Sequence, residues 1–336
     1  MKNILLINTG GTIGMVRSAD GYQPRKGYFR GALEAIAELR RPDMPAWDYV
    51  ETDPLLDSSN MTVKEWNAIG TMLAENYDRY DGFVILHGTD TMAYTASALS
   101  FMLETLGKPV ILTGAQIPLC EVRSDGRDNL VTSLLIAADG HVNEVCLYFG
   151  GKLLRGNRAT KYSADDFIAF ASPNYPPLAE AGITIRYNER ALLPKPGGAM
   201  RLQKLEQVPI GVIKVFPGIQ FELFESIMTE NLRGVVIETF GAGNIPMGGG
   251  ALLPIIRRAF SSGTIVTVCS QCPQGTVLLG AYETSSELKR SGAVSGHDLT
   301  TEAAVAKLYY LFSRGGDKET VKAEMERDLR GELRGR

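Results

Sequence analysis

The sequence predicts an α/β fold of two doubly wound domains, each built on a mainly parallel sheet. Short apolar runs alternate with helical patterns along the chain, which is typical of βαβ units. The 336 residues are enough for two domains, and a hydrophobic content of 44% is ordinary for a chain that buries a core. A stretch rich in proline and glycine around Lys195 interrupts the alternation. We therefore expect an N-terminal domain over 1–186, a linker over 187–205 and a smaller C-terminal α/β domain over 206–336.

In the first domain, the expected strands are apolar runs with the length and branched composition of buried parallel strands. They lie at residues 4–8, 83–86, 110–113 and 144–149. Helical patterns at 32–39 and 93–106 lie between them. Consecutive parallel strands need such crossover helices, so this order predicts one sheet covered by helices.

The second domain repeats this alternation. Its expected strands lie at 210–215, 234–238 and 264–268, and its expected helices at 221–231, 251–260 and 301–313. The last twenty residues carry dense opposite charges, with apolar residues spaced four apart at Val321, Met325, Leu329 and Leu333. That spacing predicts a solvated terminal helix with one narrow apolar stripe.

Charge and cysteine content narrow the class of protein. A net charge of −3, from 35 basic and 38 acidic residues, leaves no electrostatic footprint for nucleic acid or an anionic membrane. No apolar run is long enough to span a bilayer and the chain shows no signal peptide, so we expect a soluble cytoplasmic protein. Four cysteines make no disulfide framework, in keeping with a reducing compartment. The expected partners are small molecules and copies of the chain.

Two loops place a threonine among glycines directly after an expected strand. The first reads Thr9-Gly10-Gly11-Thr12 and the second reads His87-Gly88-Thr89-Asp90-Thr91. Loops at the carboxyl ends of parallel strands meet at the edge where open α/β sheets bind ligands. The glycines can simply allow a sharp turn, and Thr91 can be a helix N-cap. Neither explanation accounts for the imidazole of His87, the hydroxyl of Thr89 and the carboxylate of Asp90. We therefore expect the hydroxyls of the two loops to lie in one pocket.

A threonine hydroxyl becomes a nucleophile only when a base removes its proton. Lys161 follows the expected strand at 144–149 and is a candidate for that role, with Asp90 tuning it. Burial lowers a lysine pKa, whereas a nearby carboxylate raises it. Glycine loops also expose backbone N–H groups, which can stabilise the oxyanion that forms when an amide is attacked.

Two other kinds of site are disfavoured. Neither glycine loop has the G-x-G-x-x-G or G-x-x-x-x-G-K-[ST] spacing of nucleotide sites, so phosphate binding loses its main support. Cys269 and Cys272 form a lone C-x-x-C pair, and the three histidines are scattered. We therefore expect no metal and no cofactor, with Cys269 a small buried residue at a strand end.

Several motifs together make this chain resemble the cytoplasmic (type I) bacterial L-asparaginases. They are collinear and spread over both expected domains: Asn8-Thr9-Gly10-Gly11-Thr12-Ile13-Gly14, Asp57-Ser58-Ser59-Asn60-Met61-Thr62, His87-Gly88-Thr89-Asp90-Thr91-Met92, Thr113-Gly114-Ala115-Gln116-Ile117-Pro118, Ala159-Thr160-Lys161 and Phe240-Gly241-Ala242-Gly243-Asn244-Ile245-Pro246. The resemblance implies an asparaginase-like fold and hydrolysis of L-asparagine to L-aspartate and ammonia through an acyl-threonine intermediate, which would serve asparagine catabolism.

The resemblance also assigns catalytic roles. It implies that Thr12 is the nucleophile and that Thr89, Asp90 and Lys161 assist proton transfer. Tyr22 would lie on a loop that closes over the substrate and supports Thr12. Which threonine attacks first is left open by the sequence.

For substrate binding, the resemblance implies two groups of contacts. The α-amino and α-carboxylate groups of asparagine would be held by Asp57, Ser58, Ser59 and Asp90. The side-chain amide would meet Thr89 and the backbone around Ala115. Asn244 would complete the site of a neighbouring subunit, which implies a homodimer or homotetramer.

One position departs from relatives that bind a second, allosteric asparagine through an arginine near a strand end. The chain has Glu238 in that stretch, and its carboxylate would repel a ligand carboxylate. We expect no activation through that site in the same form.

Other functions stay open at this point. A related amidohydrolase with glutaminase activity has the same requirements, as does the amidase partner of a transamidation complex. A non-catalytic protein that binds amino acids or nucleotides on the same scaffold is the alternative from another class, because a fold does not fix a function.

Overall fold

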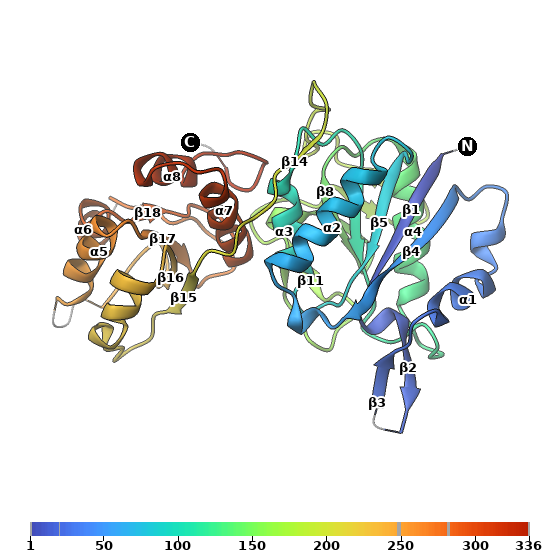
Figure 1. Cartoon of the computed structure of the whole chain (residues 1–336), viewed down its shortest axis with the longest axis horizontal. Coiled ribbons are helices and arrows are strands. Elements are labelled where there is room, and N and C mark those ends of the chain that lie inside the picture. Colours follow the sequence, from blue (N-terminus) through green and yellow to red (C-terminus); the bar gives the residue numbers. More distant parts are fainter. Residues whose placement is uncertain (1, 20, 247–249, 281–282, 335–336) are drawn as a thin grey trace. The chain divides into compact units, whose positions relative to one another are not determined.

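The computed structural model describes residues 2–19, 21–246, 250–280 and 283–334 (Figure 1). Their contacts divide the chain into two compact units, Met1–Leu202 and Gln203–Arg336. Each unit is built on its own mainly parallel sheet with helices, which confirms the predicted fold class. The boundary falls within residues 187–205, and the extent of the linker expected there stays a prediction.

The first unit is built on an eight-stranded sheet. Its strand order is β13-β12-β9-β8-β7-β5-β1-β4. The five strands from β8 to β4 run parallel, and β9, β12 and β13 add antiparallel pairs. In chain order the eight strands are β1 (Asn3–Gly10), β4 (Ala46–Leu56), β5 (Gly82–Leu86), β7 (Val110–Thr113), β8 (Val145–Phe149), β9 (Lys152–Arg155), β12 (Ala179–Ala181) and β13 (Ile185–Tyr187).

Helices cover both faces of this sheet because its central strands are apolar on both sides. Figure 1 shows α2 (Val63–Asn76) and α3 (Met92–Met102) along one side of the sheet and α1 (Tyr28–Ala35) and α4 (Gly126–Asp139) along the other. Successive side chains of a strand point to opposite faces. Accordingly, Ile4 and Leu6 of β1 pack in one core with residues of α1 and α4.

Short elements surround the carboxyl edge of this sheet. After β1 come the 3₁₀ turn Thr12–Gly14 and a hairpin of β2 (Met15–Ser18) and β3 (Gly21–Pro24). The two-stranded pair of β10 (Thr160–Lys161) and β11 (Phe170–Ala171) follows β9. A further pair, of β6 (Leu103–Glu104) and β14 (Arg201–Leu202), lies toward the opposite, amino edge, because β6 follows the end of α3 and precedes the start of β7.

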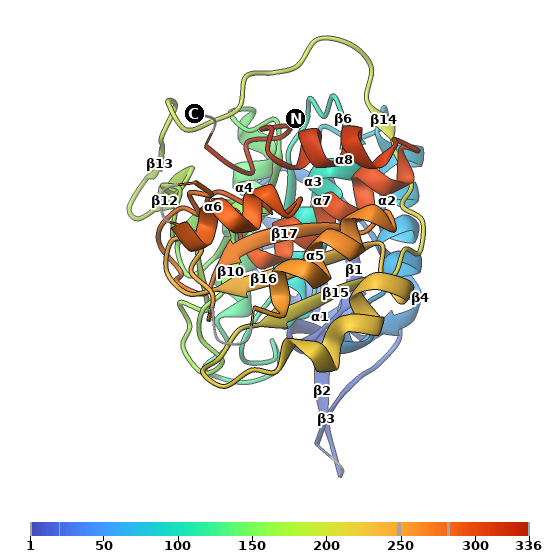
Figure 2. The same cartoon turned by 90° about the vertical axis from the view of Figure 1, so that its left-hand side faces the viewer.

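The second unit has a parallel four-stranded sheet of order β15-β16-β17-β18. Figure 2 shows β15 to β17 running side by side in this sheet. The strands are β15 (Ile210–Lys214), β16 (Gly234–Thr239), β17 (Ile265–Ser270) and β18 (Val294–Ser295), and the helices are α5 (Leu252–Ser261), α6 (Glu283–Arg290), α7 (Thr301–Ser313) and α8 (Lys318–Met325). Its core joins β16 and β17 to the buried face of α5.

All seven predicted strands are present within two residues of the expected bounds, and α5 and α7 confirm two predicted helices. Two predicted helices have different bounds in the structure. The helix expected at 32–39 is α1, which begins at Tyr28 and ends at Ala35, and the helix expected at 93–106 is α3, which ends at Met102, just before β6. The stretch expected as a helix at 221–231 is helical but irregular, because it begins as a 3₁₀ helix at Phe221–Phe224 and ends as a π-helix at Ile227–Asn231.

The terminal helix expected over the last twenty residues is present only in its first half, as α8. α8 ends at Met325, and a tighter arrangement follows in which Leu333 is buried. The reason is a buried ion pair of 2.6 Å between Lys307 of α7 and Glu332. The Glu332 carboxylate also accepts hydrogen bonds from the backbone N–H groups of Leu329 and Arg330, so it turns the chain back onto α7. Among the residues described, no helix has the length and apolar character needed to cross a membrane.

Candidate active site

The two glycine loops are in direct contact at the carboxyl edge of the first sheet. Gly10 and Gly11, which follow β1, both have positive φ. A Cβ atom on Gly11 would lie 2.4 Å from the backbone nitrogen of Gly88, and one on Gly10 would lie 2.2 Å from the carbonyl oxygen of Leu56. Only glycine allows backbones to approach so closely. The structure thus brings the loop that carries Thr12 against the loop that carries Thr89.

Lys161 joins the second loop from β10. Its ammonium donates a hydrogen bond of 2.9 Å to Thr89 Oγ1 and lies 2.6 Å from Asp90 Oδ1. Thr89 is buried and the Lys161 side chain is 21% exposed, whereas the Asp90 side chain is 65% exposed. Exposure limits what the ion pair contributes to stability, so the Thr89 contact is the better protected of the two.

The Thr89 hydroxyl has a second partner that the sequence reasoning missed. Its oxygen lies 3.3 Å from Gln116 Oε1, to which it donates. Gln116 is itself held in place, because its backbone N–H donates to the Asp125 carboxylate at 3.0 Å and its side-chain amide donates to the carbonyl of Asp166. With Lys161 donating to Thr89 and Thr89 donating to Gln116, the Thr89 oxygen keeps one free lone pair.

Asp57, Ser58 and Ser59 form a short capped turn beside the second loop. The Asp57 carboxylate accepts a hydrogen bond of 3.0 Å from the backbone N–H of Ser59. Ser58 is buried, and its carbonyl accepts a hydrogen bond from the Thr91 hydroxyl at 2.7 Å. A Cβ atom on Gly88 would lie 2.4 Å from Ser58 Oγ, which shows how tightly the turn and loop pack.

Ala115 is buried at the end of β7, in a segment fixed by α4. Asn129 of α4 donates to the carbonyl of Gly114 at 3.1 Å, and the Asp125 carboxylate accepts from the backbone N–H of Ile117 at the same distance. The backbone around Ala115 is therefore preorganised, as oxyanion donors need to be.

Thr12 faces an open cavity of about 450 Å³. Tyr22, Gln116 and Glu121 also line this cavity. The Thr12 hydroxyl has no hydrogen-bond partner among the residues that the structure describes. Tyr22 lies on β3, and its hydroxyl donates to Glu121 Oε1 at 2.8 Å and not to Thr12. Glu121 is a second residue that the sequence reasoning missed, because a lone glutamate in a surface loop carries no pattern.

His87 supports the second loop from within the core. Burial lowers its pKa to about 4, so the ring is neutral. Trp66 Nε1 donates to Thr95 Oγ1 at 3.0 Å, and Thr95 lies 2.9 Å from His87 Nε2. His87 Nδ1 lies 2.8 Å from the carbonyl oxygen of Gly88, to which it donates. The histidine thus orients the peptide next to Thr89 and does not line the Thr12 cavity.

Asn244 and Glu238 lie in the second unit. Asn244 exchanges backbone hydrogen bonds of 2.8 and 3.0 Å with Phe240 in a tight turn after β16. Glu238 accepts a hydrogen bond of 2.5 Å from the Thr301 hydroxyl. The roles that the sequence predicts for both residues stay predictions.

The cysteine pair has no reactive character at Cys269. Burial raises the pKa of the Cys269 thiol to about 12, and Cys272 is exposed in the loop that follows β17. All four cysteines are free. Within the described ranges, no group of three or more potential ligands from histidine, cysteine, aspartate and glutamate is placed to hold a metal ion.

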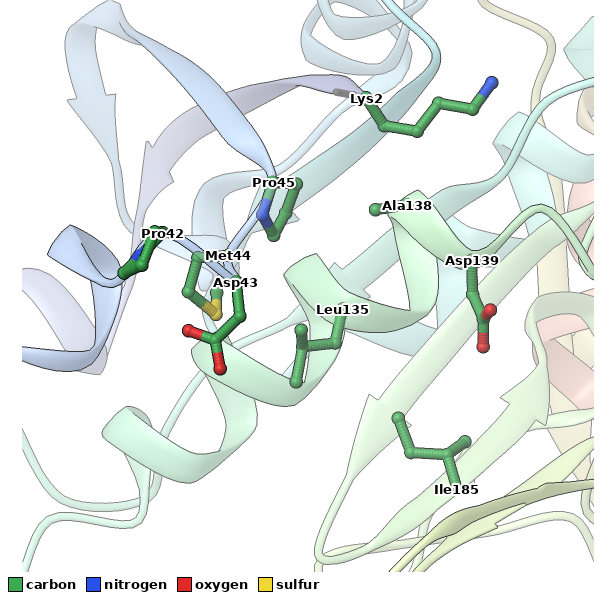
Figure 3. A pocket seen from close by; sticks show the side chains of 9 residues that line it. All are labelled: Lys2, Pro42, Asp43, Met44, Pro45, Leu135, Ala138, Asp139 and Ile185. Carbon is green, nitrogen blue, oxygen red and sulfur yellow. The ribbon is translucent and has the colours of Figure 1, made fainter.

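A second cavity, of about 430 Å³, lies at the opposite, amino edge of the first sheet (Figure 3). Met44, Leu135 and Ile185 form much of its lining. Two of its charged residues are already paired, since Lys2 lies 2.8 Å from Asp81 and Asp43 lies 2.9 Å from Arg41. It contains none of the predicted site residues, so the Thr12 cavity is the candidate active site.

Comparison with known proteins gives a consistent result over both units. Residues 3–193 match the family model described as asparaginase, N-terminal, and residues 209–325 match the glutaminase/asparaginase C-terminal domain. The chain is 47% identical to L-asparaginase 1 of Escherichia coli K12 over 99% of its own length and 98% of that protein. A crystal structure of L-asparaginase I from Vibrio cholerae is similar with a TM-score of 0.93, 47% identity and 99% coverage of both chains. The thermostable L-asparaginase of Thermococcus kodakarensis follows at a TM-score of 0.90 and 32% identity, covering 99% of this chain and 100% of that one.

Proposed function

Since this chain belongs to the asparaginase family and hydrolyses L-asparagine to L-aspartate and ammonia, we propose that the reaction runs through an acyl-threonine intermediate on Thr12. It is an amidohydrolase that acts on a linear amide. The observation that carries the assignment of the nucleophile is the position of Thr12. Its hydroxyl faces the cavity unpaired, and its loop lies against the loop of Thr89, Asp90 and Lys161.

In the first step, Thr12 Oγ1 attacks the side-chain amide carbon of asparagine and gives up its proton. The carbonyl oxygen becomes an oxyanion, which backbone N–H groups near Gly11, Gly88 and Ala115 stabilise. One donor of this kind contributes roughly 3 to 4 kcal/mol to lowering the barrier. When the tetrahedral intermediate collapses, the C–N bond breaks and the nitrogen leaves as ammonia with the added proton. A β-aspartyl ester of Thr12 remains.

In the second step, water attacks this ester and Thr12 leaves as the restored hydroxyl. Thr89 is suited to relay a proton in this step, because Lys161 and Gln116 occupy two of its hydrogen-bonding positions and one lone pair stays free. It takes up the proton of the water there while it passes its own hydroxyl proton to the departing Thr12 oxygen, so it remains a neutral hydroxyl. Lys161 stabilises the charge on Thr89 during the transfer, and Asp90 holds the ammonium of Lys161. General acid–base assistance of this kind adds about 10²- to 10⁴-fold in rate.

Different polar residues around the loops bind the α-ammonium and the α-carboxylate groups of asparagine. Asp57 and the exposed Asp90 carboxylate are suited to the α-ammonium of asparagine. Ser58, Ser59 and the backbone of their turn are suited to its α-carboxylate. Tyr22 supports Thr12 from the hairpin. No cofactor is required, because the leaving group is ammonia and the nucleophile is a side chain.

We further propose that the enzyme is a homo-oligomer, a dimer or a tetramer, in which Asn244 completes the site of a neighbouring subunit. This role fits the rigid turn that holds Asn244 after β16. A cytoplasmic location is our proposal as well, supported by the four free cysteines. The cellular role would be asparagine catabolism.

Glutaminase activity, a place in a transamidation complex and simple amino-acid binding are the alternatives, and the relatives named L-asparaginase give them less support. Ammonia release from asparagine, compared with release from glutamine and with a Thr12→Ala variant, separates them. We expect release from asparagine to dominate and to vanish in Thr12→Ala. Release from glutamine alone would favour a glutaminase, and none from either would favour a binding protein.

A further inference from the structure

The hydroxyl of Tyr22 is bound to a carboxylate outside the predicted set of catalytic and substrate-binding residues. Tyr22 Oη donates to Glu121 Oε1 at 2.8 Å, and Arg17 Nε lies 3.9 Å from the same oxygen. The Arg17 guanidinium also lies over the Tyr22 ring, 5.9 Å from its centroid. The three residues join both strands of the β2–β3 hairpin to the loop that follows β7. The hydrogen bond to Glu121 raises the pKa of Tyr22, so the phenol keeps its proton and stays a donor.

The hairpin is anchored through β2, which is half-buried at three of its four residues and whose Met15 carbonyl accepts a hydrogen bond from Cys120 Sγ, whereas β3 has few other contacts. All four residues of β3 are exposed, and Tyr22 itself is 41% exposed. Figures 1 and 2 both show the hairpin projecting from the first unit as a two-stranded finger. A segment with few buried contacts opens locally at low cost, so one directional hydrogen bond at its side has a large share in fixing its position.

Glu121 is, by contrast, presented on a well-fixed loop. Its backbone N–H donates to the carbonyl of Pro118 at 3.0 Å, and Asp125 holds the start of the loop through the backbone N–H groups of Gln116 and Ile117. The N–H of Leu119 donates to the carbonyl of Ile13 at 3.0 Å, which ties the loop to the turn that carries the nucleophile. The backbone that carries Glu121 is therefore held in place relative to the turn of Thr12 by hydrogen bonds.

We propose that Glu121 is a positioning residue for the hydrolytic reaction, whose carboxylate holds the Tyr22 hydroxyl, and with it the β2–β3 hairpin, beside the Thr12 cavity. Glu121, Tyr22 and Thr12 line the same cavity, so a shift of the hairpin changes the surroundings of the nucleophile directly. The inference rests on the proposed function, in which Tyr22 supports Thr12. Glu121 acts through Tyr22 and does not touch the reacting atoms.

The test compares Glu121→Ala, Glu121→Gln and the parent chain by two measurements, amide hydrogen exchange of the hairpin and kcat/KM for asparagine. A hydrogen bond to a carboxylate that is partly exposed to water changes an equilibrium constant, here that between the closed and the opened hairpin, by about fivefold. We expect Glu121→Ala to exchange hairpin amides about fivefold faster and to lose about fivefold in kcat/KM. Glu121→Gln, which keeps an acceptor oxygen, should recover most of both. Glu180→Ala, at an exposed glutamate on β12, is the matched control and should change neither.

A double-mutant cycle shows whether Glu121 acts through Tyr22. In a Tyr22→Phe background, Glu121→Ala should have no further effect on kcat/KM. In an active parent chain, the positioning role is overturned if Glu121→Ala leaves either measurement unchanged, or if its effect persists undiminished in Tyr22→Phe. The proposed function stays intact in those cases. A parent chain that releases no ammonia from asparagine overturns the proposed function instead.

Discussion

Lys161 and Thr89 are seventy-two positions apart in the chain, yet the ammonium of one donates to the hydroxyl of the other at 2.9 Å. Two short elements at the carboxyl edge of the first sheet create this contact. The loop after β5 brings Thr89, and β10, held by its pairing with β11, brings Lys161. A cation placed beside a buried hydroxyl raises its acidity and stabilises the charge that builds up on it during proton transfer.

Removing this cation should therefore slow the reaction more than it weakens binding. We expect Lys161→Met to lower kcat by about 10² to 10⁴, with a smaller change in KM. Steady-state ammonia release measures both constants. Lys152→Met is the control, because Lys152 is exposed on β9 and should leave the rate as it is. A Lys161→Met variant with an unchanged kcat would contradict the role of Lys161.

The contact between the glycine loop and the Ser58 turn predicts a steric effect. Gly88→Ala places a Cβ atom 2.4 Å from Ser58 Oγ, so the backbone must shift. Overpacking of this kind costs about 1 to 3 kcal/mol in the free energy of unfolding, and the shift should also reduce activity. Gly31→Ala is the matched control, since a Cβ atom on Gly31 in α1 would meet nothing within 4 Å and should be neutral or slightly stabilising. Denaturant titration compares the two, and equal stability would refute the packing argument.

The buried His87 predicts a dependence of stability on pH. Its folded pKa of about 4 lies below the ordinary value of 6.5, so the unfolded chain binds more protons between these values. Stability from this residue is complete above pH 6.5 and is lost as the pH falls toward 4, by about 3 kcal/mol in all. In His87→Gln this part of the slope should disappear, although the variant is less stable at pH 7. Equal slopes in both chains between pH 4 and 6.5 would show that His87 is not buried in its neutral form.

Because Lys307 and Glu332 form a buried ion pair, we expect replacing one of them to destabilise the fold more than replacing both. Both side chains are fully buried, so Lys307→Met alone leaves an unpaired carboxylate in the core. This should cost about 3 to 5 kcal/mol in the free energy of unfolding, whereas Lys307→Met with Glu332→Leu should recover much of the loss. Thermal or denaturant unfolding of the parent chain, Lys307→Met, Glu332→Leu and the double variant tests this. A double variant as unstable as the sum of the singles would contradict it.

Much of the fold followed from the sequence because buried parallel strands are continuous apolar runs. β4 was not predicted, because all of its residues are half-buried or exposed and its sequence includes Asp48, Glu51 and Pro54. The terminal helix was mispredicted because apolar residues four apart satisfy a helical period even when the chain turns after Met325. A buried charged pair such as Lys307 and Glu332 leaves no periodic signal.

At the site, sequence motifs predicted the functional residues that lie in glycine loops or directly after strands. The structure brings Thr89, Asp90 and Lys161 together and places Ser58 against Gly88. Glu121 and Gln116 were not predicted as site residues, because each matters through the hydroxyl that donates to it. Glu121 accepts from Tyr22, and Gln116 accepts from Thr89. Those contacts depend on how loops far apart in sequence pack, and a residue type in a loop does not encode them.

In the proposed reaction, Thr12 carries the acyl group. Rapid quenching of the enzyme during turnover of asparagine, followed by proteolysis and mass spectrometry, locates the β-aspartyl ester directly. We predict the ester on the peptide that contains Thr12 and none in a Thr12→Ala variant, which should also release no ammonia. An ester on the peptide that contains Thr89, or ammonia release undiminished in Thr12→Ala, would contradict this account.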